Sequence, residues 1–178
     1  HEGATHLGIA SDHVIESFRN DLWPGYKTSE GMPPELLAQI PVVETERLVL
    51  RAFRSADLDA FAAMSADAEV MRFIGSGETL DRNMAWRNMA GFNGHWTLKG
   101  CGMWAIERKS DGAFLGRVGL HHPPYWPALE AGWTLVRTAW GQGYAREGAR
   151  AAIDFAHRAL PPQRLVSFIR PGNQRSVK

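Results

Sequence analysis

The stretch that decides the fold is "TAWGQGYAREGARAAIDFA", from Thr138 to Ala156. From Ala145 onward its apolar residues recur at helical spacing, with charged residues between them, which predicts an amphipathic helix. Gly141 and Gly143 stand directly before that helix, where Ser, Thr, Asp or Asn would ordinarily cap it. The first turn of a helix presents N–H groups that attract anions, and glycine lets a phosphate approach them closely. The stretch therefore predicts either a phosphate-binding turn or a tight strand-to-helix turn without a ligand.

The residues around Gly143 exclude two common phosphate-binding loops. A P-loop requires a lysine directly after its second glycine, and Tyr144 stands there instead. The dinucleotide fingerprint requires a third glycine where Arg146 stands, and no acidic residue follows on a second strand. Neither a P-loop NTPase nor a Rossmann dehydrogenase is supported.

The composition is that of one ordinary globular domain. The chain has 178 residues, of which 44% are hydrophobic, so material for a core is ample. Its formal net charge of +1 is too balanced for a nucleic-acid surface, and no apolar run approaches the ~20 residues of a membrane span. The single cysteine, Cys101, permits neither an internal disulfide nor a cysteine zinc site. We expect a cytoplasmic protein with no metal, nucleic-acid partner or membrane association.

Hydrophobic patterning along the chain predicts a mixed α/β fold. Ser55 and Thr79 are the expected caps of the first two helices, and Asp111-Gly112 is a hairpin signal. Strands are expected within residues 44–53, 102–109, 113–120, 130–137 and 164–170, and helices within 55–67, 79–93 and from 145 onward. The order β-α-α-β-β-β-α-β indicates a mixed sheet with helices on its faces.

The N-terminal part of the chain differs in character from the rest. Residues 1–23 alternate apolar and polar side chains around "HVIESF", which favours a strand. Residues 24–43 are rich in proline and glycine and predict a linker. The main domain is therefore expected at residues 44–178.

The sequence Trp140-Gly141-Gln142-Gly143-Tyr144-Ala145 resembles the acetyl-CoA signature [RQ]-x-x-G-x-[GA] of the GNAT superfamily of N-acyltransferases. Tryptophan at its first position is a departure, and it is typical of the branch that resembles ribosomal-protein N-terminal (alanine/serine) acetyltransferases. The segments "TERLVLR", "DAEVMRFIG", "EAGWTL" and "IRPGNQRS" resemble the same branch in the same order. The resemblance covers roughly residues 44–178.

This resemblance implies the GNAT fold, with helices on both faces of the sheet, and acetyl-CoA as co-substrate. It implies transfer of an acetyl group to a primary amine by direct attack in a ternary complex. The acceptor would be an amine-bearing small molecule or a protein N-terminus. The alternative is a non-catalytic acyl-CoA-binding or interaction module of the same fold. In the family, amides of this loop hold the pyrophosphate, which points here to Gly141, Gln142, Gly143, Tyr144 and Ala145. The preceding strand pairs with the pantetheine arm, which points to Thr134, Leu135 and Val136.

Glu130 is the candidate catalytic base. Period-two alternation places it on the same strand face as Gly132 and Thr134. Transfer to an amine requires its neutral form, so a carboxylate acting through water can remove the proton. The alternative is an ordinary solvated glutamate. His121 and His122 follow a strand and are expected to line the acceptor pocket, or else to be part of a polar loop.

Asn173 and Ser176 match the family's N-x-x-S pattern beside the thiol. The resemblance implies that Asn173 contacts the cofactor and that Ser176 forms a hydrogen bond with the leaving thiolate. The alternative for Ser176 is a helix N-cap.

The resemblance implies a further helix and two strands after Val177-Lys178. That helix often carries a tyrosine general acid, so no residue is assigned this role. "HEGATHLG" at residues 1–8 resembles the entry to the family's sixth strand, and "SDHVIESFR" would then be the seventh. The C-terminal strands are therefore expected to be missing or supplied by the N-terminal segment, within one chain or by exchange in a homodimer. A truncated domain and an unrelated N-terminal extension remain the alternatives.

Overall fold

Six strands form one mixed sheet in the computed structural model, which describes residues 40–177. The strand expected within residues 1–23 and most of the linker lie outside the described residues. Neighbouring strands follow the order of the chain, and every pair is antiparallel except the last, which is parallel. The strands are β1 (Val43–Glu44), β2 (Leu48–Arg51), β3 (Met103–Arg108), β4 (Phe114–His121), β5 (Leu129–Leu135) and β6 (Leu165–Val166).

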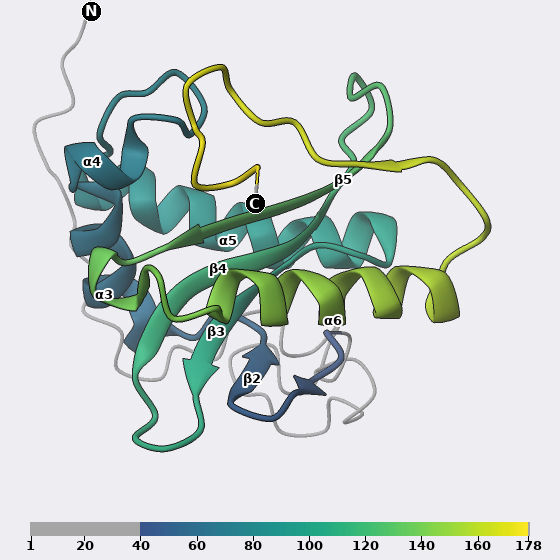
Figure 1. Ribbon diagram of the computed structural model, residues 1–178, viewed down its shortest axis with the longest axis horizontal. Coiled ribbons are helices and arrows are strands. Elements are labelled where there is room, and N and C mark those ends of the chain that lie inside the picture. Colours follow the sequence, from purple (N-terminus) through teal and green to yellow (C-terminus); the bar gives the residue numbers. More distant parts are fainter. Residues whose placement is uncertain (1–39, 178) are drawn as a thin grey trace, which may run out of the picture. The chain divides into compact units, whose positions relative to one another are not determined.

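Helices cover both faces of this sheet, as the sequence predicts (Figure 1). One face packs against α6, and the other against α3 and α5. The helices are α3 (Leu58–Ser65), α4 (Ala68–Met71), α5 (Arg82–Lys99) and α6 (Tyr144–Ala159), with 3₁₀ turns η1 (Ser55–Asp57) and η2 (Arg137–Ala139). No helix in the described part of the chain has the length and hydrophobicity needed to cross a membrane.

The two-sided core follows from the alternation of side chains along β3. Trp104 and Ile106 are fully buried in the cluster that contains the small residues of α6. Met103 and Ala105 point to the opposite face and pack in the cluster of Phe53 and Phe61. The β3–β4 hairpin turns at Gly112, whose φ of 71° matches the expected turn.

Both expected helix caps are wrong. Ser55 lies within η1, and α3 begins after Asp57, whose carboxylate accepts the Arg54 N–H at 2.8 Å and pairs with buried Arg51 at 2.7 Å. In α5 the cap is Asp81, which accepts the Met84 N–H at 2.7 Å. Thr79 lies before the helix, in a segment without regular secondary structure.

The last strand is shorter than the expected 164–170. β6 contains only Leu165 and Val166, which pair with Leu129 and Glu130 at the start of β5. Beyond Glu130 strands β5 and β6 diverge. Within residues 40–177, the rest of β5 therefore pairs only with β4. This separation creates the open edge at which the candidate site lies.

Candidate functional site

The helix α6 starts without a side-chain cap. Gly143 occupies the cap position with a φ of 82°, and Gly141 has a φ of 74°, so both glycines adopt the left-handed conformation that favours this residue. The N–H groups of residues 141–146 have no hydrogen-bond partner among the described residues. The first regular bond of the helix runs from the Glu147 N–H to the Gly143 carbonyl at 3.0 Å. Consecutive N–H donors therefore remain available to an anion.

The turn before α6 is held in place by the segment between β1 and β2. Arg47 donates from Nη1 to the Gln142 carbonyl at 3.0 Å and from Nε to Glu147 at 2.7 Å. Its guanidinium also lies 4.5 Å from the centre of the Tyr144 ring. The Thr45 hydroxyl donates to Glu147 at 2.6 Å. These contacts fix the donors of the turn before any ligand arrives, which lowers the entropy cost of binding.

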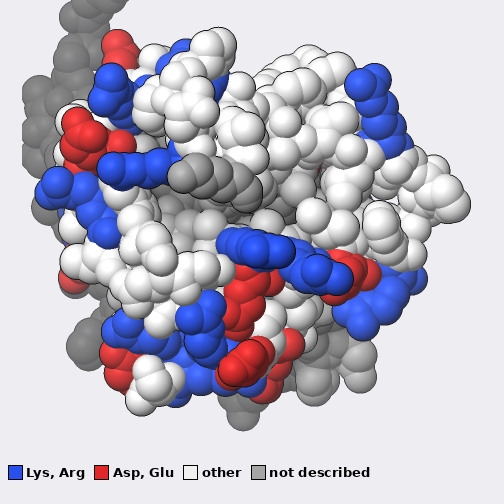
Figure 2. Space-filling model, in the orientation of Figure 1, with Lys and Arg blue, Asp and Glu red and all other residues white. Residues whose placement is uncertain are grey.

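A pocket of about 1480 Å³ opens beside this turn. Its walls are α6, the open edge of β5, the segment after β6 and the region of α4. Figure 2 looks onto this face, and basic side chains stand along the lower edge of the hollow. The pocket brings together eight of the residues expected from the sequence: Thr134, Leu135, Gly141, Gly143, Tyr144, Ala145, Asn173 and Ser176.

The open edge of β5 has a defined set of free backbone groups. In an antiparallel pair, alternate residues direct their N–H and C=O groups to the partner strand. The Val136 N–H donates to the Leu115 carbonyl at 3.0 Å, so this alternation also directs the Thr134 backbone to β4. Trp133 and Leu135 therefore face the open edge, and the Leu135 carbonyl accepts the Trp140 indole N–H at 2.9 Å. The expectation that the backbone groups of Thr134 and Val136 are free is therefore not met, whereas the Leu135 N–H faces the open edge.

The side chain of Thr134 is buried without a partner. It is 6% exposed, and its Oγ1 is the one fully buried side-chain polar atom within residues 40–177 that lacks a hydrogen bond. Such atoms are costly in folded proteins and mark sites where a ligand can complete the bonding. Thr134 is also one of the residues that line the pocket.

The pocket is lined by more basic than acidic side chains. Four arginines line it, against the two carboxylates Glu69 and Asp154. The four are Arg72, Arg146, Arg150 and Arg175. None of them forms an ion pair with a carboxylate of the described residues. The sequence analysis did not identify them, although the i, i+4 spacing of Arg146 and Arg150 on a predicted helix was a visible signal.

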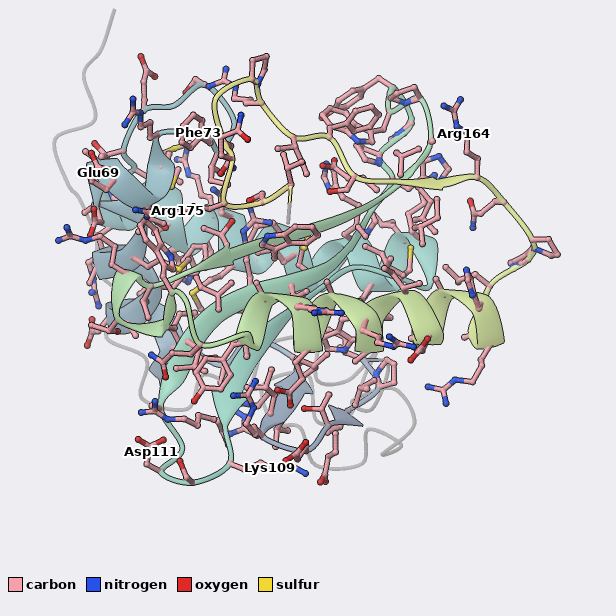
Figure 3. All side chains as sticks on the ribbon, viewed as in Figure 1. Glu69, Phe73, Lys109, Asp111, Arg164 and Arg175 are labelled. Atoms are coloured by element: carbon pink, nitrogen blue, oxygen red, sulfur yellow. The ribbon has the colours of Figure 1, made fainter. Side chains whose placement is uncertain are left out.

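The segment after β6 closes the end of the pocket near α4. Arg175 stacks on Trp140 with its guanidinium 4.9 Å from the ring centre. Figure 3 places Arg175, Phe73 and Glu69 at this end of the molecule and Arg164 at the other. Ser176 and Asn173 lie in a turn in which the Ser176 N–H donates to the Asn173 carbonyl at 3.2 Å.

Glu130 lies outside the pocket lining, at the point where β5 and β6 separate. Its Oε2 accepts the Trp126 indole N–H at 2.8 Å, and its side chain is partly exposed. Trp126 also packs edge-on against Phe168 of the segment after β6, with ring centres 5.9 Å apart. The hydrogen bond from Trp126 therefore orients the Glu130 carboxylate through its Oε2 atom.

The expected histidines also lie outside the pocket lining. His121 stands opposite Glu130 in the register and stacks on His95, with ring centres 5.6 Å apart. Burial, with the nearby charges of His95, Arg117 and His122, lowers the pKa of His121 to about 4. His121 is therefore neutral at pH 7, and its pKa is too low for an efficient base there.

His95 is a residue that the sequence analysis missed. Its Nδ1 lies 2.6 Å from the Cys101 carbonyl, and its Nε2 accepts the His122 N–H at 3.3 Å. A carbonyl can only accept, so Nδ1 donates this bond. His95 thereby holds the backbone of His122 in place. Within residues 40–177 no group of three or more His, Cys, Asp or Glu side chains could hold a metal ion.

Comparison with known proteins shows the family. Residues 47–178 match the model of the acetyltransferase (GNAT) domain, so the chain belongs to the GNAT acetyltransferase family and is an acyltransferase. It is 26% identical over 137 residues to the uncharacterised N-acetyltransferase YoaA of Bacillus subtilis, covering 76% of this chain and 77% of that protein.

Solved structures agree with this assignment. The acetyltransferase from Agrobacterium tumefaciens C58 matches with a TM-score of 0.70 and 33% identity, over 78% of this chain and 79% of that one. RimL, a ribosomal L7/L12 α-N-protein acetyltransferase solved with coenzyme A, matches with a TM-score of 0.64 and 18% identity, over 77% and 79%. At that identity RimL shares the fold alone.

Proposed function

We propose that this chain transfers an acetyl group from acetyl-CoA to a primary amine, by direct attack of the amine in a ternary complex. The observation that carries the proposal is the start of α6, beside a pocket of about 1480 Å³, where the N–H groups of residues 141–146 have no partner within residues 40–177. Such a row of donors at a helix N-terminus suits a pyrophosphate. The family membership supports the same reaction class.

The residues present fit coenzyme A along the whole pocket. The turn at Gly141–Ala145 would hold the pyrophosphate, and Arg146 and Arg150 would add charge for its phosphates. The backbone of Trp133 and the N–H of Leu135 would pair with the amide groups of the pantetheine arm, because these two residues face the open edge of β5 and the Leu135 carbonyl already accepts the Trp140 indole N–H. Bound acetyl-CoA supplies an acetyl thioester, whose C–S bond is exchanged for the C–N bond of the product amide.

Glu130 serves as the base in this proposal. An amine arrives as an ammonium ion and must lose a proton before its nitrogen can attack. Oε2 of Glu130 is engaged by Trp126, and Oε1 has no hydrogen-bond partner among residues 40–177, so Oε1 is the oxygen that receives the proton, directly or through water. Ser176 lines the pocket, and its hydroxyl is suited to donate to the departing sulfur.

The test measures thiol release from acetyl-CoA with a panel of primary amines. We expect at least one amine to be acetylated, and Glu130→Gln to lower kcat roughly a hundredfold, as loss of a general base does. The affinity for coenzyme A, measured by calorimetry, should not change in that variant. Glu46→Gln, which alters an exposed glutamate between β1 and β2, is the matched control. Tight binding of coenzyme A with no transfer to any amine would instead favour a non-catalytic acyl-CoA-binding module.

A further inference from the structure

Arg117 lies in the middle of β4 without a carboxylate partner. Its side chain is partly buried, and the guanidinium lies 5.0 Å from the centre of the Phe92 ring of α5. The arginines of β2 and β3 are paired: Arg51 contacts Asp57 at 2.7 Å and Arg108 contacts Asp111 at 2.6 Å. Arg117 has neither an ion pair nor a hydrogen bond to any residue in the range 40–177.

An unpaired charge inside a protein is costly, and buried charges are ordinarily paired. Burial lowers the pKa of Arg117 to about 10, against the opposing effect of Glu130, so the side chain is still charged at pH 7. Within residues 40–177, Thr134 Oγ1 is the only fully buried side-chain polar atom that lacks a partner. The unpaired nitrogens of Arg117 are therefore not fully buried. The guanidinium therefore retains some exposed surface.

Thr134 stands directly opposite Arg117 across the β4–β5 pair. Opposite residues of an antiparallel pair project from the same face, with Cβ atoms roughly 5 Å apart. The unpaired guanidinium and the buried, unpartnered hydroxyl are thus neighbours. Together they offer several donors to one pair of oxygens, which is the arrangement that a carboxylate requires.

The same face of the sheet connects this pair to Glu130. The register places Gly119 opposite Gly132, and then His121 opposite Glu130. Two opposed glycines leave the strip between the pairs without side chains of its own, and the Cε of Met103 lies over Gly132. The strip is therefore an apolar floor with a cation at one end and a carboxylate at the other.

From this juxtaposition we infer that the acceptor is a small amine that also carries a carboxylate, held by Arg117 and Thr134 while its amino group reaches Glu130. The inference rests on the proposed function and specifies its substrate class. Four residues of strand separate the two ends, roughly 13 Å between Cα atoms, and the long side chains of Arg117 and Glu130 shorten this span. The acceptor is thus expected to separate its two charges by several methylene groups.

The test compares acids with their neutral amides. The panel contains glycine, β-alanine, 4-aminobutyrate and 6-aminohexanoate, each beside its primary amide. We expect the longer acids to have a KM at least about tenfold below that of their amides, as a charge-assisted pair provides. Arg117→Met should remove that difference by raising the KM of the acid, with kcat little changed. Arg87→Met, on the exposed side of α5, is the matched control.

A binding measurement separates this inference from the proposed function. N-acetyl-6-aminohexanoate is titrated by calorimetry into the protein saturated with coenzyme A, and its affinity should fall about tenfold in Arg117→Met. Thr134→Val, which keeps the volume of the side chain, should weaken it severalfold, and melting curves check that both variants fold. This readout decides the inference even if no amine is acetylated.

Three outcomes would overturn it. Acids and amides could be used equally well, or Arg117→Met could weaken coenzyme A alone. The preferred acceptor could also be a peptide N-terminus with neutral side chains that is indifferent to Arg117→Met.

Discussion

Arg47 and Glu147 are joined by two hydrogen bonds, from the Arg47 main-chain N–H to Oε1 at 2.9 Å and from Arg47 Nε to Oε2 at 2.7 Å. The two residues are 100 positions apart in the chain. The same carboxylate accepts the Thr45 hydroxyl, so one side chain fastens the first turn of α6 to the segment between β1 and β2. The start of the helix, and with it the orientation of the unpartnered N–H groups, depends on this contact.

Glu147→Ala should lower the free energy of unfolding by about 1–2 kcal/mol, because three hydrogen bonds to a carboxylate are lost. Burial acts to raise the pKa of Glu147, but the bonds from Thr45 and Arg47 outweigh it and the pKa is lowered. This contribution is therefore complete above the ordinary glutamate pKa of 4.5 and is lost as the pH falls through the lower pKa of the folded state. Urea unfolding at several pH values measures it. Equal losses in Glu147→Ala and in the exposed variant Glu46→Ala would contradict the prediction.

Gly143→Asp should weaken coenzyme A binding at least about a hundredfold, because a negative charge and a Cβ enter the turn where N–H groups meet the pyrophosphate. The φ of 82° also strains any other residue there. Gly112→Asp carries comparable strain at a φ of 71° in the β3–β4 turn and is the matched control. Calorimetry should find the control unchanged, and an unchanged Gly143→Asp would refute the phosphate site.

Arg150→Met should weaken coenzyme A about five- to tenfold, since a charge that lines the pocket is removed. Arg158 lies on the same helix but does not line the pocket, so Arg158→Met should have no effect. The difference in affinity between the two variants should shrink as the salt concentration rises from about 50 to about 500 mM, because salt screens exposed charges. A salt-independent or equal effect of the two substitutions would place the phosphates elsewhere.

His121 should stay neutral down to about pH 4, since burial is the main cause of its lowered pKa. The unfolded chain binds this proton near the ordinary value of 6.5, and the folded chain does not. Stability is therefore expected to fall as the pH drops from 6.5 towards 4, and to level off below the folded pKa. His121→Gln should flatten this part of the curve, while the exposed His157→Gln should not. An NMR titration of His121 with a midpoint near 6.5 would contradict it.

Asp81→Ala should destabilise the protein by about 1 kcal/mol, because the Met84 N–H loses its cap. Thr79→Ala should leave thermal unfolding unchanged, since Thr79 precedes the helix. Equal effects of the two substitutions would show that the cap contributes nothing.

Local signals were sufficient for much of the fold. Gly141 and Gly143 could be predicted at the start of α6, since a helix that begins on glycines has a recognisable pattern. Asp111-Gly112 likewise predicted the β3–β4 turn. The caps were harder, because Thr79 and Asp81 are both suitable residues and the path of the chain decides between them.

The remaining features depend on contacts that are distant in sequence. The length of β6 is determined by where its chain leaves β5, which its own residues do not encode. Arg175 reaches Trp140 only because the segment after β6 returns over η2. Arg117 looks like an ordinary strand arginine until the register shows which residues surround it.

The separation of β5 from β6 gives a single strand two kinds of amide. The N–H groups of Thr134 and Val136 are held by β4, whereas those of Trp133 and Leu135 face the open edge. In hydrogen–deuterium exchange, the free protein should therefore show slow and fast amides alternating residue by residue along the end of β5. A ligand that pairs with this edge would slow only the fast set, so the strand would act as a built-in reporter of occupancy.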